Sequence, residues 1–356
     1  MRRRQHIRRG LLAAVLVAAV AFAAPSSSAA DDDYEWYPGL PDAPPGFASW
    51  GASSMGGISY AKRAKQWFRA PDGMSTWLAN VFSGDPVAVG DGSLTRSYGA
   101  NGVAYIVSPD GAPANYGYMA PMTVRSVGFG LMPVEATVQV SQRRENGLPI
   151  PLQSKLTGTD HYAESPWAPG KPGEKFKQVA QETVVDDAFN IQILTVRVDG
   201  VDLGLTGECR TQTPAPFRLV GPGYTIDDPG QPPHDPAVDK DYLTEWYRTH
   251  DPSTYFHPLW GGELSGTMTI PPFTGCTTQA GDDLSALMTL SVSGPDNPVS
   301  ARIGWICTKE TGADRGGPLA PGMSAPKLTQ AWKAEGSPVE GCYGTKKFAY
   351  PDRADD

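Results

Sequence analysis

The chain has 356 residues, of which 30 are Lys or Arg and 38 are Asp or Glu, and its formal net charge is −8. A chain of this length can bury one large hydrophobic core or two smaller ones. The acidic balance disfavours phosphate binding by clustered cations, so we expect no nucleic-acid partner. The 40 glycines and 34 prolines disfavour a helical bundle, because both residues interrupt helices.

Residues 1–30 have the features of a signal peptide. Five arginines precede an apolar run from Leu11 to Ala24, and small residues lead up to Asp31. The apolar run is too short to cross a bilayer, and no later segment is long and apolar enough to do so. We predict cleavage after Ala30, which leaves a secreted chain with 25 basic and 38 acidic residues, a net charge of −13. Arg8 and Arg9 leave twin-arginine export open beside the general secretory route.

Residues 31–75 are rich in Pro, Gly, Ser and aromatic residues. We expect an extended arm that packs on a core formed later in the chain, with a short helix at Ile58–Phe68. Aromatic residues in such an arm stack on sugars or anchor the arm to its own domain. Those of the arm include Trp36, Tyr37, Phe47 and Trp50.

Residues 76–356 predict a mainly β fold. Val134–Val140 alternates apolar and polar residues, and the pairs Asn146–Gly147 and Asp199–Gly200 are typical of tight hairpin turns. The proline-containing segment 148–152 is expected at a sheet edge. Shorter strands are expected at Val103–Val107, Met122–Phe129, Phe217–Val220 and Leu264–Ile270. Because no long helices separate the strands, the pattern favours an antiparallel β-sandwich, either one or two.

Residues 221–258 interrupt this strand pattern with a polar, irregular insertion. It contains the best helix candidate of the chain, Val238–His250, on which Tyr242, Trp246 and Tyr247 share one face. Loops that project from a rigid sandwich commonly carry binding residues. We therefore predict a binding surface on these three side chains. Residues 308–356 are expected to form an irregular tail.

Four cysteines in an exported chain predict two disulfides, and their spacing matches no zinc motif. Residues 286–293 and 299–305 look like the two strands of a hairpin, with Cys276 and Cys307 at its open end. We therefore predict a Cys276–Cys307 bond, which leaves Cys209 to pair with Cys342. Both bonds are expected to be structural, because exported thiols are oxidised.

No complete catalytic motif is present. The chain lacks Gly-x-Ser-x-Gly, and Ser59-x-x-Lys62 stands without the companion motifs of the serine enzymes that use it. Glu245 and His250 are five residues apart, which is not the spacing that brings two metal ligands onto one helical face. We expect no catalytic residues, no metal and no cofactor.

Three successive segments within residues 187–307 carry a resemblance. They are VDGVDLGLTGECRT, GGELSGTMTIPPFTGC and DDLSALMTLSVSGPDNPV. In their amino-acid sequence and in their order, these segments resemble a group of exported actinobacterial proteins described as secreted or hypothetical. The resemblance implies a β-rich extracytoplasmic protein and brings no activity or site residues.

Two functions are compatible with these observations. The first is a non-catalytic cell-envelope or extracellular protein that binds a wall glycan or a surface partner. The second is a secreted hydrolase, glycan-directed or metal-dependent, with its carboxylates or histidines in residues 221–258. A cleft with two facing carboxylates, or convergence of Glu245, His250 and His257, would favour the enzyme. A flat, aromatic-lined sheet face would favour binding.

Overall fold

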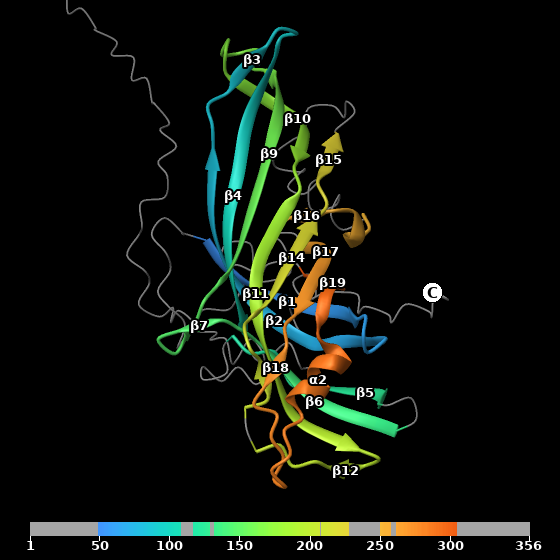
Figure 1. The fold of residues 1–356 in the computed structure, drawn as a ribbon. Coiled ribbons are helices and arrows are strands. Elements are labelled where there is room, and N and C mark those ends of the chain that lie inside the picture. The colour runs from blue at the N-terminus through green and yellow to red at the C-terminus, as the bar shows by residue number, and fades with distance from the viewer. Residues whose placement is uncertain are drawn as a thin grey trace, which may run out of the picture.

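The computed structural model describes residues 49–107, 117–128, 132–206, 208–227, 250–257 and 261–304 (Figure 1). The expected signal peptide, insertion helix and tail lie outside these residues. The described part is mainly β, with antiparallel pairing throughout and one short α-helix, which confirms the predicted mainly β, antiparallel class. No helix among the described residues is both long and apolar enough to cross a membrane.

The long strands carry most of the structure. They are β1 (Ser49–Ala61), β2 (Gln66–Ser83), β4 (Ser93–Val107), β5 (Met122–Gly128), β6 (Met132–Gln142), β9 (Leu152–Glu164), β10 (Pro172–Ala180), β11 (Thr183–Val198), β14 (Ala215–Gly221), β17 (Gly261–Ile270) and β19 (Gly294–Ile303). The shorter elements are β3 (Val87–Val89), β7 (Arg144–Glu145), β8 (Leu148–Pro149), β12 (Val201–Asp202), β13 (Arg210–Thr211), β15 (Tyr224–Asp227), η2 (Pro252–Thr254), β16 (Phe256–His257), β18 (Phe273–Thr274) and α2 (Ser285–Val292).

Eight strands pair into a closed ring in the order β1, β2, β4, β9, β11, β14, β17, β19 and back to β1. The ring closes where β1 pairs with β19, from Met55 opposite Ile303 to Ser59 opposite Val299. Apart from the β7–β8 pair, the described strands therefore form one sheet closed on itself.

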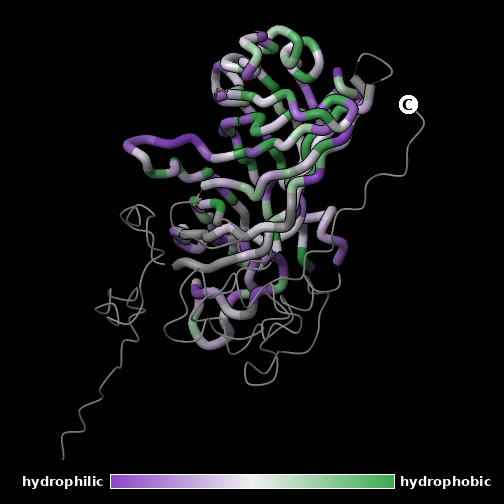
Figure 2. Tube along the Cα trace, turned by 90° about the horizontal axis from the view of Figure 1, so that it is seen from below, coloured by the Kyte–Doolittle hydropathy of each residue, from purple (hydrophilic) through white to green (hydrophobic). Residues whose placement is uncertain are grey.

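Period-two alternation determines which side chains point into the ring. Along β14, for example, Ala215, Phe217, Leu219 and Gly221 are buried and the intervening residues are less so. Figure 2 shows hydrophobic and hydrophilic residues alternating along the strands. The inward faces of β4, β11, β14, β17 and β19 contribute one shared hydrophobic cluster.

Gln142 lies at the point where β6 replaces β9 as the neighbour of β11. Its side chain is fully buried, and its Nε2 donates to the carbonyls of Ala104 and Ile150, each at 3.0 Å. Its Oε1 accepts from the Ile106 N–H at 2.7 Å. One side chain thus satisfies three backbone groups at a junction where the strand ladder changes partner.

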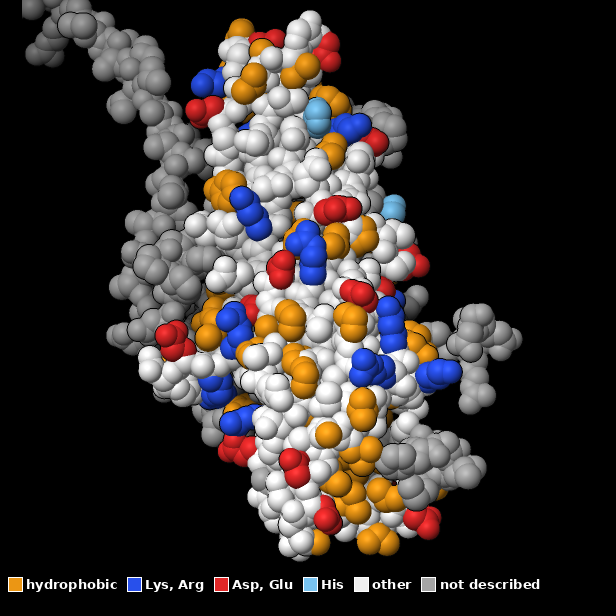
Figure 3. Space-filling view, viewed as in Figure 1, with side chains coloured by type: hydrophobic (Ala, Val, Ile, Leu, Met, Phe, Trp, Pro, Cys, Tyr) orange, Lys and Arg blue, Asp and Glu red, His pale blue; other side chains and the backbone are white. Residues whose placement is uncertain are grey.

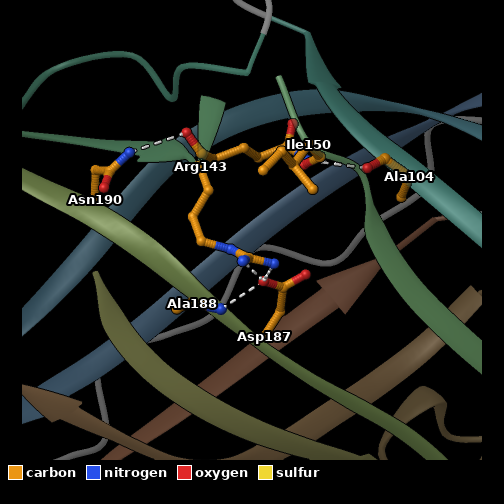
Figure 4. Close-up of polar contacts among 7 residues, drawn as sticks. Ala104, Arg143, Ile150, Asp187, Ala188 and Asn190 are labelled. Atoms are coloured by element: carbon orange, nitrogen blue, oxygen red, sulfur yellow. Dashed lines mark hydrogen bonds and ion pairs between the residues drawn. The ribbon is translucent and has the colours of Figure 1, made fainter. Parts of the chain in front are cut away.

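An ion pair anchors the same junction from β11. The Asp187 carboxylate accepts from the Arg143 guanidinium at 2.8 Å and from the Ala188 N–H at 2.7 Å (Figure 4). The Asp187 side chain is 7% exposed, and removing Arg143 would leave a buried charge without its partner. We assign this pair a structural role.

The predicted hairpin at 286–305 is wrong in its first half, because residues 285–292 form the helix α2. Leu284, Met288 and Val292 recur at helical spacing and pack on the core. The Asp283 carboxylate accepts from the Ser285 N–H at 2.8 Å at the helix start. β19 follows the helix and pairs with β17 and β1.

The predicted cysteine pairing is also wrong. Cys209 is bonded to Cys276, with Cα atoms 4.1 Å apart. β13 pairs with β18, so Arg210 lies opposite Thr274 and the two cysteines come together beside them. Both cysteines are fully buried in a hydrophobic cluster. Cys307 and Cys342 lie outside the described residues.

Residues 49–75, expected in an arm with a helix at Ile58–Phe68, form β1 and the first half of β2 instead. The expected helix is wrong, because β1 pairs with both β2 and β19, and this pairing outweighs local preference. Residues 224–227 of the expected insertion form β15, which pairs with β10. Both predicted turns are confirmed by positive φ angles, at Asn146–Gly147 (51° and 83°) and Asp199–Gly200 (50° and 79°).

Candidate functional site: an apolar cavity inside the ring

A cavity of about 480 Å³ lies between the inward faces of the ring strands, β5, β6 and α2. Its walls are mostly aliphatic and aromatic side chains. Representative lining residues are Phe68, Val138, Val185, Phe217, Leu264 and Met288. The volume lies within the range of about 300–1,000 Å³ that small-molecule pockets occupy.

The β6 wall of the cavity is the strand with the clearest sequence pattern. Val134, Ala136, Val138 and Val140 all line the cavity. β6 is held between β5 and β11, so its inward face is fixed by pairing on both sides. The alternation along this strand therefore correctly predicted a buried face. It did not predict that the face borders a cavity.

Few polar side chains line the cavity. Among the lining residues that the structure describes, Arg63 is the one with a charge, and none is Asp or Glu. Ser154 on β9 is 6% exposed, and its hydroxyl makes no hydrogen bond to the described residues. A buried hydroxyl without a partner costs free energy, so Ser154 is available to a polar group of an occupant.

A second cavity of about 430 Å³ adjoins the first, between Gln66–Arg69 of β2 and Met122–Arg125 of β5. The two cavities share the lining residues Gln66, Phe68, Met122 and Val124. β2 pairs with β4 from Met74 onward, and within the described strands β5 pairs with β6 alone. The edges of β2 and β5 that face each other here are not joined by backbone pairing within the described strands. They border a polar opening beside the apolar cavity.

A separate polar cluster lies on β4, β9 and β10, away from the cavity lining. The Asp160 carboxylate accepts from Tyr162 at 3.1 Å and pairs with Lys175 at 3.3 Å. Burial raises the pKa of Tyr98 to about 12. The Tyr98 ring packs over Gly158, its cross-strand neighbour, where a Cβ atom would collide with it. We interpret this cluster as structural, because Asp160 already has partners in Tyr162 on its own strand and Lys175 on β10.

The surface of the face shown in Figure 3 carries charges of both signs across its middle and hydrophobic side chains at its lower end. Among the ion pairs of exposed arginines, Arg218 pairs with Asp186 at 3.3 Å and Arg197 pairs with Glu135 at 3.6 Å. Such alternating exposed charges produce no strong field of one sign.

The sequence-predicted site residues fall mainly outside the described chain. Tyr242, Trp246, Tyr247 and Glu245 are among them, so the predicted binding surface stays a prediction. His257 lies on β16 with its ring 6.4 Å from that of Tyr224. No group of three or more His, Cys, Asp or Glu side chains in the described residues is arranged to hold a metal ion.

Ser59 and Lys62 lie at the end of β1 and in the turn after it. They therefore do not have the one-turn helical geometry that the Ser-x-x-Lys pattern requires.

No family model matches the chain, and no curated protein or solved structure is similar enough to count as a match. The fold and the cavity define the class of protein instead: a mainly antiparallel β protein, with a disulfide, whose strands surround an apolar cavity.

Proposed function

We propose that this protein is an exported, non-catalytic binding protein of the cell envelope or extracellular space, and that the cavity holds an apolar ligand with an alkyl chain. The cavity carries the proposal, because its walls are mostly aliphatic and aromatic side chains that a hydrocarbon chain can contact. Export is supported by the signal-peptide features of residues 1–30 and by the Cys209–Cys276 disulfide, since disulfides persist in oxidising compartments. Binding of a wall glycan or surface protein through Tyr242, Trp246 and Tyr247 remains a separate proposal.

The energetics of an empty cavity support an occupant. Protein interiors contain few voids larger than a water molecule. Apolar surface left facing water costs about 25 cal/mol per Å², so the unfilled apolar walls of the cavity carry a free-energy cost. A ligand that fills the cavity recovers part of this free energy.

The proposal predicts how affinity depends on chain length. Each buried methylene contributes about 0.8 kcal/mol, which is roughly a fourfold gain in affinity per carbon. Straight-chain alcohols of increasing length should displace an environment-sensitive fluorescent alkyl probe with this increment. The gain should stop once the cavity is full. Affinity that does not depend on chain length, or no displacement by any alcohol, would refute an alkyl-chain site.

A further inference from the structure

The turn between β1 and β2 carries three cations, and one of them, Arg63, lines the cavity. Lys62, Arg63 and Lys65 lie within four residues that contain no acid. The Arg63 side chain lines the cavity and lies over Gly294, where a Cβ atom would approach the Arg63 Nε at 3.6 Å. α2, whose residue Met288 also lines the cavity, ends just before Gly294.

These three cations have no carboxylate partner among the described residues. Other arginines in the described chain do, since Arg302 pairs with Glu263 at 2.9 Å and Arg125 with Glu135 at 2.9 Å. Although the net charge of the protein is −8, this turn adjoins the apolar cavity with three cations and no acid. It supplies positive charge where a ligand's polar end would emerge.

We infer that the ligand is an anionic amphiphile, a long-chain carboxylate, whose head group is bound by Arg63. This inference rests on the proposed function. A guanidinium presents a planar fork of donors that matches a carboxylate in geometry. The neighbouring Lys62 and Lys65 strengthen the positive potential, so they favour an anionic head group over a neutral one and repel a cationic one. The alkyl chain extends from this edge along the inward face of β2.

The opening between β2 and β5 gives the ligand a route into the apolar cavity. It begins at Gln66, three residues after Arg63, and its lining residue Phe68 also lines the apolar cavity. A chain entering between the two strand edges can bury its methylenes while its carboxylate stays at the surface beside the basic turn. The polar and apolar ends of the ligand thus meet complementary surroundings.

The test compares three ligands with the same alkyl chain: a carboxylate, an alcohol and a trimethylammonium. In displacement of the same fluorescent probe at low salt and neutral pH, the wild-type protein should bind the carboxylate roughly 3–10-fold more tightly than the alcohol, as expected for a partly exposed charge-assisted contact. The trimethylammonium should bind most weakly. The preference for the carboxylate should shrink as salt is raised.

Three variants separate the head-group anchor from the cavity. Arg63→Gln should remove the preference for the carboxylate, because it should lower the affinity for the carboxylate much more than the affinity for the alcohol. Arg63→Lys should keep part of the preference, because it retains the charge without the fork. Arg218→Gln, which removes an exposed arginine with an ion pair elsewhere, is the matched control and should bind as the wild type does.

The outcomes distinguish the two proposals. Equal binding of carboxylate and alcohol by the wild type, or an undiminished preference in Arg63→Gln, would overturn the inference while leaving the alkyl-chain site intact. If no alkyl compound binds, both proposals fail. Alcohol affinity in Arg63→Gln reports whether that variant is folded, and a loss of alcohol binding in Arg63→Lys as well would assign Arg63 to folding instead of head-group binding.

Discussion

Filling the cavity from its β6 wall should stabilise the protein and abolish ligand binding. Ala136 lines the cavity, and the Ala136→Phe substitution directs an aromatic ring into it. Burying roughly 150 Å² of aromatic surface contributes up to about 4 kcal/mol at about 25 cal/mol per Å². Adjustment of the surrounding side chains costs about 1–3 kcal/mol. We expect a net gain of roughly 1–3 kcal/mol in the free energy of unfolding.

The assay is thermal unfolding of the ligand-free protein, followed by probe binding. The gain should appear as a rise in Tm of about 2–6 °C, together with loss of the fluorescent probe signal. Gln139→Phe is the matched control, because Gln139 lies on the same strand and is not among the cavity-lining residues. It should leave Tm and probe binding nearly unchanged. If Ala136→Phe lowers Tm, as overpacking of a filled core does, the cavity does not exist in solution and the account is wrong.

Three further predictions concern the framework. Replacing Cys209 and Cys276 together by Ala should lower the free energy of unfolding, measured in urea, by about 4 kcal/mol, because the bond closes a loop with a sequence separation of 67. Peptide mapping of the wild type should recover the Cys209–Cys276 pair. Gly158→Val should destabilise the protein by roughly 2 kcal/mol or more, since the added side chain collides with Tyr98, whereas Gly90→Ala, with open space around it, should be nearly neutral in the same unfolding assay. Because the folded-state pKa of Tyr98 is raised to about 12, its contribution to stability is fully present below the unfolded-state pKa of about 10 and is lost as pH rises from there through about 12. An ultraviolet titration should show one tyrosine that ionises near pH 12 and is missing in Tyr98→Phe. Ionisation of all tyrosines near pH 10 would contradict this prediction.

Local patterns predicted the elements that depend on local chemistry. The β6 strand alternates cleanly, and the Asn146–Gly147 and Asp199–Gly200 pairs supply residues that tolerate positive φ. α2 was missed because Ala286, Met288, Leu290 and Val292 also alternate with period two. A short apolar run of this kind fits a strand or a helix equally well, and only its surroundings decide between them.

The features that depend on distant pairing could not be predicted from sequence. Cys209 meets Cys276 because β13 pairs with β18, and no signal near either cysteine specifies that contact. The cavity depends on the closure of β1 against β19, which joins residues more than 200 positions apart. Arg63 by itself belongs to what looks like an ordinary solvated turn. Its position at the edge of a cavity follows from ring closure alone.

The most direct test of the alkyl-chain site is a crystal structure of the protein soaked with a straight-chain alcohol that carries bromine at its far end. The account predicts one anomalous bromine peak inside the ring, among side chains such as Val138, Phe217 and Leu264. Bromine found only on the outer surface, in a crystal whose strands enclose the cavity described above, would contradict it.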